Sequence, residues 1–280
     1  MKRVYCLLAV LSLATAPASA KVWAVVTPAT VDPGGVFQVK AQDSEDPKAT
    51  AKATFAGITR PLEPLRGVLR ALTPVPAATR PGTYPVYVIV NGKRIQSKVT
   101  VRAKHFPRQN IKMAPSKTSL MDPKILAKER EILNAAYAIH TPEPLWTESF
   151  IVPTPGRSSS AWGRIRTVNG KRWGQHQGAD ISAATGVPVK ATNSGEVVVA
   201  QTLWMRGKTV VLDHGLGVFS MYNHLDRLDA RPGDRVARGE VIGTVGATGF
   251  VTGAHLHWEL RIGSVSINPW PIVKNGLPLG

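Results

Sequence analysis

The stretch that most constrains the fold of this chain is Gly253–Leu260, with the sequence GAHLHWEL. Its alternation of polar and apolar residues predicts a β-strand, because successive side chains of a strand point to opposite faces. His255, His257 and Glu259 then share one face, and apolar residues occupy the other. The apolar face predicts a strand that packs on a core and holds both histidines rigidly. One histidine can ligate a metal ion while the other stays free to move protons beside it.

The composition indicates a soluble globular protein of up to two modest domains, with 43% hydrophobic and 19% charged residues among 280. The formal net charge of +17 suggests an anionic partner such as a cell-wall polymer, nucleic acid or acidic lipid. No nucleic-acid-binding motif accompanies the charge, so nucleic acid is not expected as a partner. A solvated basic surface explains the charge equally well.

Residues 1–20 are typical of a secretory signal peptide. Lys2 and Arg3 supply the positive charge, Val4–Ala14 is apolar, and Ala18–Ala20 offers small residues at the cleavage position. The apolar run is too short to span a bilayer, so no stable membrane insertion is expected after cleavage. Cys6, the only cysteine, falls inside this segment, and the mature chain would therefore contain no disulfide. We expect a secreted, periplasmic or cell-wall-associated protein.

Residues 21–102 are predicted to form a small immunoglobulin-like β-sandwich, because short alternating runs are separated by Pro and Gly. Asn91-Gly92 is a strong hairpin signal. The predicted strands are Val22–Val26, Val36–Ala41, Thr83–Val90 and Arg94–Val101. Residues 103–147 are predicted as a linker with one helix, which begins with Asp122 as N-cap and Pro123 as its first residue.

Residues 148–280 are rich in Gly and β-forming residues and predict a single antiparallel β domain without a strongly periodic helix. The expected strands are Val187–Ala191, Gly195–Gln201, Thr209–His214, Val218–Asn223, Val241–Gly246 and His255–Ile262. The fold class is therefore mainly β.

Two further segments of this domain carry side chains suited to metal chemistry. His176 and Asp180 lie four residues apart, and His224 follows the predicted strand Val218–Asn223. Taken singly, the first pair is explained by a loop hydrogen bond and His224 by a satisfied core position. Together with the His-x-His pair, they favour a metal site.

These segments resemble, in the same order, the H-x-x-x-D, Tyr-x-His and H-x-H motifs of the lysostaphin-type zinc metallopeptidases, the M23 or LytM family. The resemblance covers about residues 148–270 and includes the framing segments Asp213–Gly217, Gly233–Val236 and Gly239–Gly243. It implies an antiparallel metallopeptidase fold.

The resemblance also implies a Zn²⁺ ion held by His176, Asp180 and His257, with water in the fourth position. It implies that His255 is the general base, and that His224 orients the water or stabilises the developing oxyanion. The residues alone do not decide which histidine of the H-x-H pair binds the metal.

The long basic segment Arg157–Trp173 and the turn Leu203–Lys208 are predicted to wall a substrate groove. Trp204 in that turn is predicted to contact substrate. Tyr222 is predicted to share a strand face with His224 and to bind substrate as well, although packing explains it nearly as well.

We therefore predict a zinc endopeptidase that hydrolyses peptide bonds in the stem or cross-link peptides of bacterial peptidoglycan. One alternative is a non-catalytic, cell-wall-binding regulator of other wall hydrolases, and another is a protease of ordinary proteins. Every expected ligand position is filled, which favours activity. The sequence does not define an oligomeric state.

Overall fold

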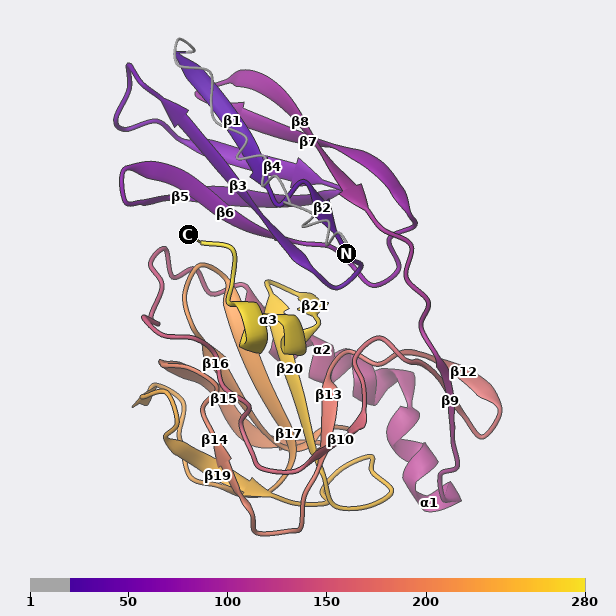
Figure 1. Ribbon diagram of the computed structural model, residues 1–280. Coiled ribbons are helices and arrows are strands. Elements are labelled where there is room, and N and C mark those ends of the chain that lie inside the picture. The colour runs from indigo at the N-terminus through magenta and orange to yellow at the C-terminus, as the bar shows by residue number, and fades with distance from the viewer. Residues whose placement is uncertain (1–20, 280) are drawn as a thin grey trace, which may run out of the picture.

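The computed structural model describes residues 21–279 and is built mainly of β-strands (Figure 1). An N-terminal eight-stranded sheet lies above a ten-stranded sheet that holds the C-terminal half, and helix α2 and a three-stranded sheet lie to one side. Every strand pair of the ten-stranded sheet is antiparallel. The prediction of a mainly β fold with an antiparallel C-terminal sheet is confirmed. The predicted domain boundaries stay predictions.

The N-terminal sheet forms a sandwich in which two groups of strands pack face to face. Its order is β1-β3-β6-β5-β4-β7-β8-β2. The Phe37 and Phe55 rings meet edge to face in the core, with centroids 5.1 Å apart. The strands are β1 (Val22–Thr27), β2 (Thr30–Val31), β3 (Val36–Asp43), β4 (Ala51–Phe55), β5 (Ile58–Leu65), β6 (Val68–Pro74), β7 (Gly82–Val90) and β8 (Lys93–Val101).

The segment predicted as a linker contributes ordered structure beside the C-terminal sheet. Strand β9 (Arg108–Ile111) pairs in parallel with β11 (Ile165–Val168), which pairs with β12 (Lys171–Gln175) in a three-stranded sheet. α1 (Pro115–Thr118) and a 3₁₀ turn (Ser119–Met121) follow β9. The long basic segment and the linker therefore form one structural unit.

Helix α2 (Pro123–Tyr137) begins where the sequence predicts, because the Asp122 side chain accepts a hydrogen bond of 2.7 Å from the Lys124 amide. Glu129 on this helix is fully buried. Its carboxylate accepts hydrogen bonds from the Met205 amide (2.5 Å) and the Arg206 guanidinium (2.6 Å). A buried carboxylate that is satisfied in this way fixes the helix on the C-terminal sheet.

The C-terminal sheet runs in the order β10-β13-β20-β17-β16-β15-β18, with β19 beside β17 and β14, and β21 beside β20. Its strands are β10 (Arg157–Ser160), β13 (Ala179–Ser182), β14 (Pro188–Lys190), β15 (Gly195–Leu203), β16 (Gly207–Asp213), β17 (Val218–Leu228), β18 (Arg235–Val236), β19 (Val241–Val245), β20 (Leu256–Ile262) and β21 (Val265–Ile267). A short helix, α3 (Pro269–Asn275), follows β21 and was not predicted.

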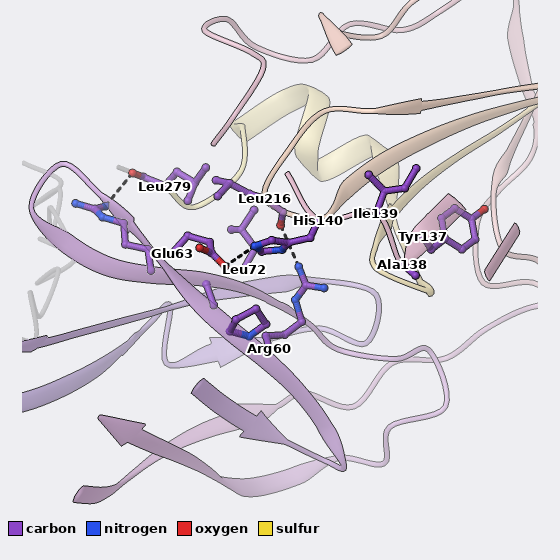
Figure 2. Close-up of a pocket in the computed structure, with 13 residues that line it drawn as sticks. Arg60, Glu63, Leu72, Tyr137, Ala138, Ile139, His140, Leu216 and Leu279 are labelled. Atoms are coloured by element: carbon purple, nitrogen blue, oxygen red, sulfur yellow. Dashed lines mark hydrogen bonds and ion pairs between the residues drawn. The ribbon is translucent and has the colours of Figure 1, made fainter. Parts of the chain in front are cut away.

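The N-terminal sandwich packs directly on the C-terminal domain, because Val36 and Leu72 belong to the core cluster that contains Trp258. Figure 2 shows polar contacts across this contact region. The Arg60 guanidinium donates to the Leu216 carbonyl at 3.0 Å. A small cavity of about 120 Å³ lies beside it. The sandwich therefore contributes side chains to the core of the domain that follows it.

Residues 1–20, predicted as a signal peptide, lie outside the described residues. Within residues 21–279, no helix combines the length and the apolar character that crossing a membrane requires.

A buried histidine of the core predicts a measurable dependence of stability on pH. His214 is fully buried, its Nδ1 donates to the Ser194 carbonyl (2.7 Å), and burial lowers its pKa to about 4. The fold favours the neutral ring, whereas the unfolded chain takes up a proton near pH 6.5. The free energy of unfolding should therefore fall by about 3 kcal/mol as the pH drops from about 6.5 to about 4.

Chemical denaturation of metal-free protein across this pH range measures the effect. His214→Gln should show a shallower loss of stability on acidification than the unchanged protein. If the free energy of unfolding fell equally with pH in the two proteins, this account of His214 would be contradicted.

Candidate active site

Strand pairing brings together residues that are 77 positions apart in the sequence. Asp180 on β13 lies directly opposite His257 on β20, and Asn223 on β17 lies opposite His257 on the other side. Directly opposed residues of antiparallel strands point to the same face. The register of β13, β20 and β17 therefore sets the position of the site.

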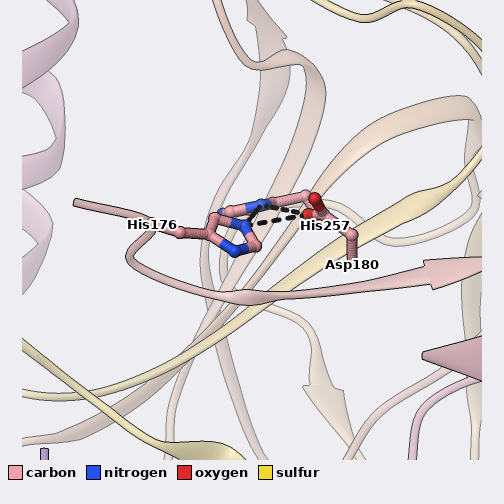
Figure 3. Close-up of side chains that lie close together, drawn as sticks. All are labelled: His176, Asp180 and His257. Atoms are coloured by element: carbon pink, nitrogen blue, oxygen red, sulfur yellow. Dashed lines mark hydrogen bonds and ion pairs between the residues drawn. The ribbon is translucent and has the colours of Figure 1, made fainter. Parts of the chain in front are cut away.

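Three predicted ligands converge on one point (Figure 3). His176 Nε2 lies 3.0 Å from Asp180 Oδ1 and 3.0 Å from His257 Nδ1, and His257 Nδ1 lies 2.8 Å from Asp180 Oδ1. All three residues are buried. Donor atoms around a tetrahedral zinc ion would be roughly 3.3 Å apart, given zinc–ligand bonds of about 2.0–2.1 Å.

Hydrogen bonds on the far side of each ligand fix its orientation. The His176 ring donates from Nδ1 to the Ala161 carbonyl at 2.9 Å, which leaves Nε2 for the metal. The His257 ring donates from Nε2 to Glu259 at 3.0 Å, which leaves Nδ1. Arg166 donates to the other oxygen of Asp180, Oδ2, at 2.5 Å. Such contacts set the tautomer and the angle of a metal ligand.

The charges of the site suit a cation. Burial opposes ionisation of Asp180, but hydrogen bonds from His176 and His257 hold the pKa of its carboxyl well below the usual value. Burial likewise opposes a charge on His257, yet hydrogen bonds to Asp180 and Glu259 raise its pKa. A divalent ion would replace the proton that this arrangement favours.

The donor set fits zinc. Two imidazole nitrogens and one carboxylate oxygen are the three-ligand pattern of catalytic zinc sites, which keep a fourth position open. Gly178 contributes to the close packing, because a Cβ atom at this position would lie 2.7 Å from His257 Nε2. A larger residue here would displace the ligand.

Two further imidazoles lie beside the three ligands. The rings of His224 and His255 are 5.0 Å apart, and His224 is 5.9 Å from His257, between ring centroids. The Nδ1 atoms donate to the carbonyls of Thr248 and Gly253, each at 2.9 Å. Burial lowers the pKa of both rings, that of His224 well below its usual value. Each ring therefore presents an unprotonated Nε2 that can accept a proton.

A β-bulge points His224 at the site. His224 has a φ of 64°, and the pairing of β16 with β17 shifts register between Lys208 and Val210. Without this irregularity, alternation would place His224 on the core face together with Tyr222. Bulges next to active sites re-aim a side chain in this way.

The prediction that Tyr222 binds substrate is wrong. The bulge separates Tyr222 from His224, and Tyr222 is fully buried in the core. Its hydroxyl accepts a hydrogen bond of 2.7 Å from the Thr192 amide and lies 2.9 Å from Ser220 Oγ. Tyr222 therefore stabilises the fold.

Trp204 is 46% exposed in the turn between β15 and β16. It does not line the cavities at the site, whereas its neighbours Met205 and Arg206 do. Its contact with substrate stays a prediction. Arg166 was missed by the sequence analysis, since a single arginine in a basic segment gives no signal of its own.

Two cavities meet at the metal ligands. The α2 cavity, of about 550 Å³, is walled on one side by helix α2. The β9 cavity, of about 310 Å³, is walled by residues 109–113 around strand β9. Both cavities are lined by Arg166, Trp173, His224, Phe250 and His257. The ligand His257 therefore borders two cavities, one walled by helix α2 and one by the segment around β9.

One more prediction concerns Glu259, which orients His257. Glu259→Gln should weaken zinc binding about tenfold to a hundredfold, which is the usual effect of replacing a group that hydrogen-bonds to a metal ligand. The neutral amide also leaves the buried Arg261 without the carboxylate that faces it. Competition with a chromogenic chelator measures the affinity. Unchanged zinc affinity would show that Glu259 does not orient the ligand.

A buried His/Asp/His ligand set with two further imidazoles beside it is typical of zinc sites that carry out hydrolysis. Here an antiparallel β-sheet holds this set. The model of peptidase family M23 matches residues 174–269. A structure assigned to peptidase M23 from Pseudomonas aeruginosa superimposes with a TM-score of 0.65 at 28% identity, covering 86% of this chain and 93% of that one. Residues 174–269 of this chain therefore carry a peptidase family M23 domain.

Other similar proteins each match less than half of this chain. The peptidoglycan DD-endopeptidase ShyA of Vibrio cholerae is 38% identical over 109 residues, which are 39% of this chain and 25% of ShyA. The catalytic domain of lysostaphin from Staphylococcus simulans is 30% identical, with 43% of this chain and 93% of that domain covered and a TM-score of 0.39. The chain spans about a quarter of the length of the curated relatives it matches first.

Proposed function

We propose that this protein is a zinc-dependent endopeptidase that hydrolyses stem or cross-link peptides of bacterial peptidoglycan. The observation that carries the proposal is the convergence of His176, Asp180 and His257 beside two imidazoles whose Nδ1 atoms donate to backbone carbonyls. A purely structural metal site would fill its fourth position with a protein ligand. Here the neighbouring groups suit proton transfer instead.

The residues divide the chemistry between them. A zinc ion bound by the three ligands would lower the pKa of a coordinated water and polarise the scissile carbonyl. His255 accepts the proton of the attacking water at Nε2 and passes it to the leaving amine. The Nδ1 proton of His224 is directed to the Thr248 carbonyl, so its Nε2 accepts. This favours water orientation over oxyanion stabilisation as the role of His224.

Peptidoglycan is proposed as the substrate on two grounds. ShyA, which is 38% identical to this chain over 109 residues, is described as a peptidoglycan DD-endopeptidase. The net charge of +17 suits a polymer that carries carboxylates. The signal-like residues 1–20 support export to the compartment that holds this polymer.

Zinc content and muralytic activity test the proposal together. We expect about one zinc ion per chain, release of soluble peptides from purified peptidoglycan, and loss of this activity with a chelator. Activity should return on adding Zn²⁺. A zinc-free protein that still binds peptidoglycan would support a regulator, and degradation of casein alone would indicate a general protease. Either result would overturn the proposal.

A further inference from the structure

Helix α2 presents a regular stripe of side chains to the α2 cavity. Leu126, Arg130, Leu133, Asn134 and Tyr137 all line it, and their spacing places them on one face of the helix. The stripe combines an apolar wall with two polar groups one turn apart. It lies outside the residues that match the family model.

Contacts at the middle and at the end of the helix hold this stripe in place. At the middle of the helix, buried Glu129 accepts hydrogen bonds from the Met205 amide and Arg206. Near its end, the Tyr137 ring packs against Phe219 with centroids 5.3 Å apart. Side chains on a helix held in this way have a defined position relative to the metal ligands in the same cavity.

Four arginines line the α2 cavity, and three of them are already neutralised. Arg166 binds Asp180, Arg206 binds Glu129, and Arg261 binds Glu259. The side chains of Arg130 and Asn134, in contrast, form no ion pair or hydrogen bond with any residue in the range 21–279. A guanidinium and a carboxamide without partners are thus left facing the cavity.

We propose that Arg130, assisted by Asn134, binds a free carboxylate of the substrate peptide in the α2 cavity and thereby determines specificity. Guanidinium is suited to bidentate binding of carboxylates, and the Asn amide adds a donor. Glu259 is the one carboxylate among the residues that line this cavity. It is enclosed and bound to Arg261 and His257, so it does not pair with Arg130. This inference rests on the proposed function and specifies its substrate as a peptide with a free carboxylate.

Cross-linked muropeptides from purified peptidoglycan provide the probe, in free-acid form and after amidation with carbodiimide and ammonia. The unchanged protein should cleave the free acids about tenfold more efficiently, in kcat/KM, than the amides. Arg130→Gln should lose this preference by losing activity on the acids alone. Arg130→Lys should restore part of the preference for the free acids, because lysine returns the positive charge but not the planar guanidinium that binds a carboxylate with two hydrogen bonds.

Lys128→Gln is the matched control, because Lys128 lies on the same helix, is exposed and does not line the cavity. This variant should keep the preference, and all variants should unfold at the same temperature. Equal cleavage of acids and amides by the unchanged protein, or an equal loss on both in Arg130→Gln, would overturn the specificity proposal alone. Absence of zinc-dependent cleavage of either form would overturn the proposed function itself.

Discussion

Asp180→Ala is expected to abolish both zinc binding and peptide hydrolysis. Asp180 supplies the only carboxylate of the ligand set and contacts both imidazole ligands, at 3.0 and 2.8 Å. Without it, two neutral imidazoles remain, and Arg166 would place an uncompensated positive charge beside the ion. Zinc measured by plasma mass spectrometry after dialysis should fall from about one ion per chain to background.

Asp226→Ala is the control for this experiment, because Asp226 is an exposed carboxylate on β17, close in sequence to His224. It should retain zinc and activity. If Asp180→Ala kept a full complement of zinc with a normal thermal unfolding curve, the proposed ligand set would be wrong.

His255→Ala is expected to keep zinc and to lose activity by roughly 10²- to 10⁴-fold, the usual contribution of a positioned acid–base group. The structure places His255 Nε2 3.8 Å from Asp180 Oδ1, outside the tight cluster of ligand atoms. His257→Ala removes a ligand and should lose both zinc and activity.

The two histidine variants are read as a pair, with zinc content and peptide release measured on the same samples. Loss of zinc in His255→Ala with retention in His257→Ala would reverse the two assignments. Retention of full activity in His255→Ala would exclude it as the base.

Much of the fold follows from local pattern. Alternation predicted β20 and the other long strands of the C-terminal sheet because each has a buried face. Strands β4, β5 and β6 escaped prediction. Their hairpin turns use Ala56-Gly57 and Arg66-Gly67, with positive φ at all four residues, in place of the Asn-Gly signal that marked the turn between β7 and β8. Pro61 and Pro64 within β5 also obscure the strand.

The candidate site was predictable in composition but not in geometry. The order of the motifs indicated His176, Asp180 and His257 together. The pairing of Asp180 opposite His257 depends on the register between β13 and β20, which no local pattern defines. The bulge at His224 depends on tertiary pairing too, and ignoring it produced the wrong prediction for Tyr222.

The surroundings of the site could not be predicted either. The segment around β9 looked like a linker because it is basic and contains Pro, yet it pairs with β11 and walls one cavity. The start of helix α2 was predicted from Asp122 and Pro123, but the sequence did not predict that Arg130 on this helix lines the α2 cavity. Long-range packing, which local sequence does not encode, decides both placements.

Anomalous diffraction at the zinc absorption edge, on crystals of the purified protein, tests the central claim most directly. The account predicts a single strong peak about 2.0–2.2 Å from His176 Nε2, His257 Nδ1 and Asp180 Oδ1, with no other protein ligand. A peak bound instead by His224 and His255, or none at these residues in protein that contains zinc, would contradict it.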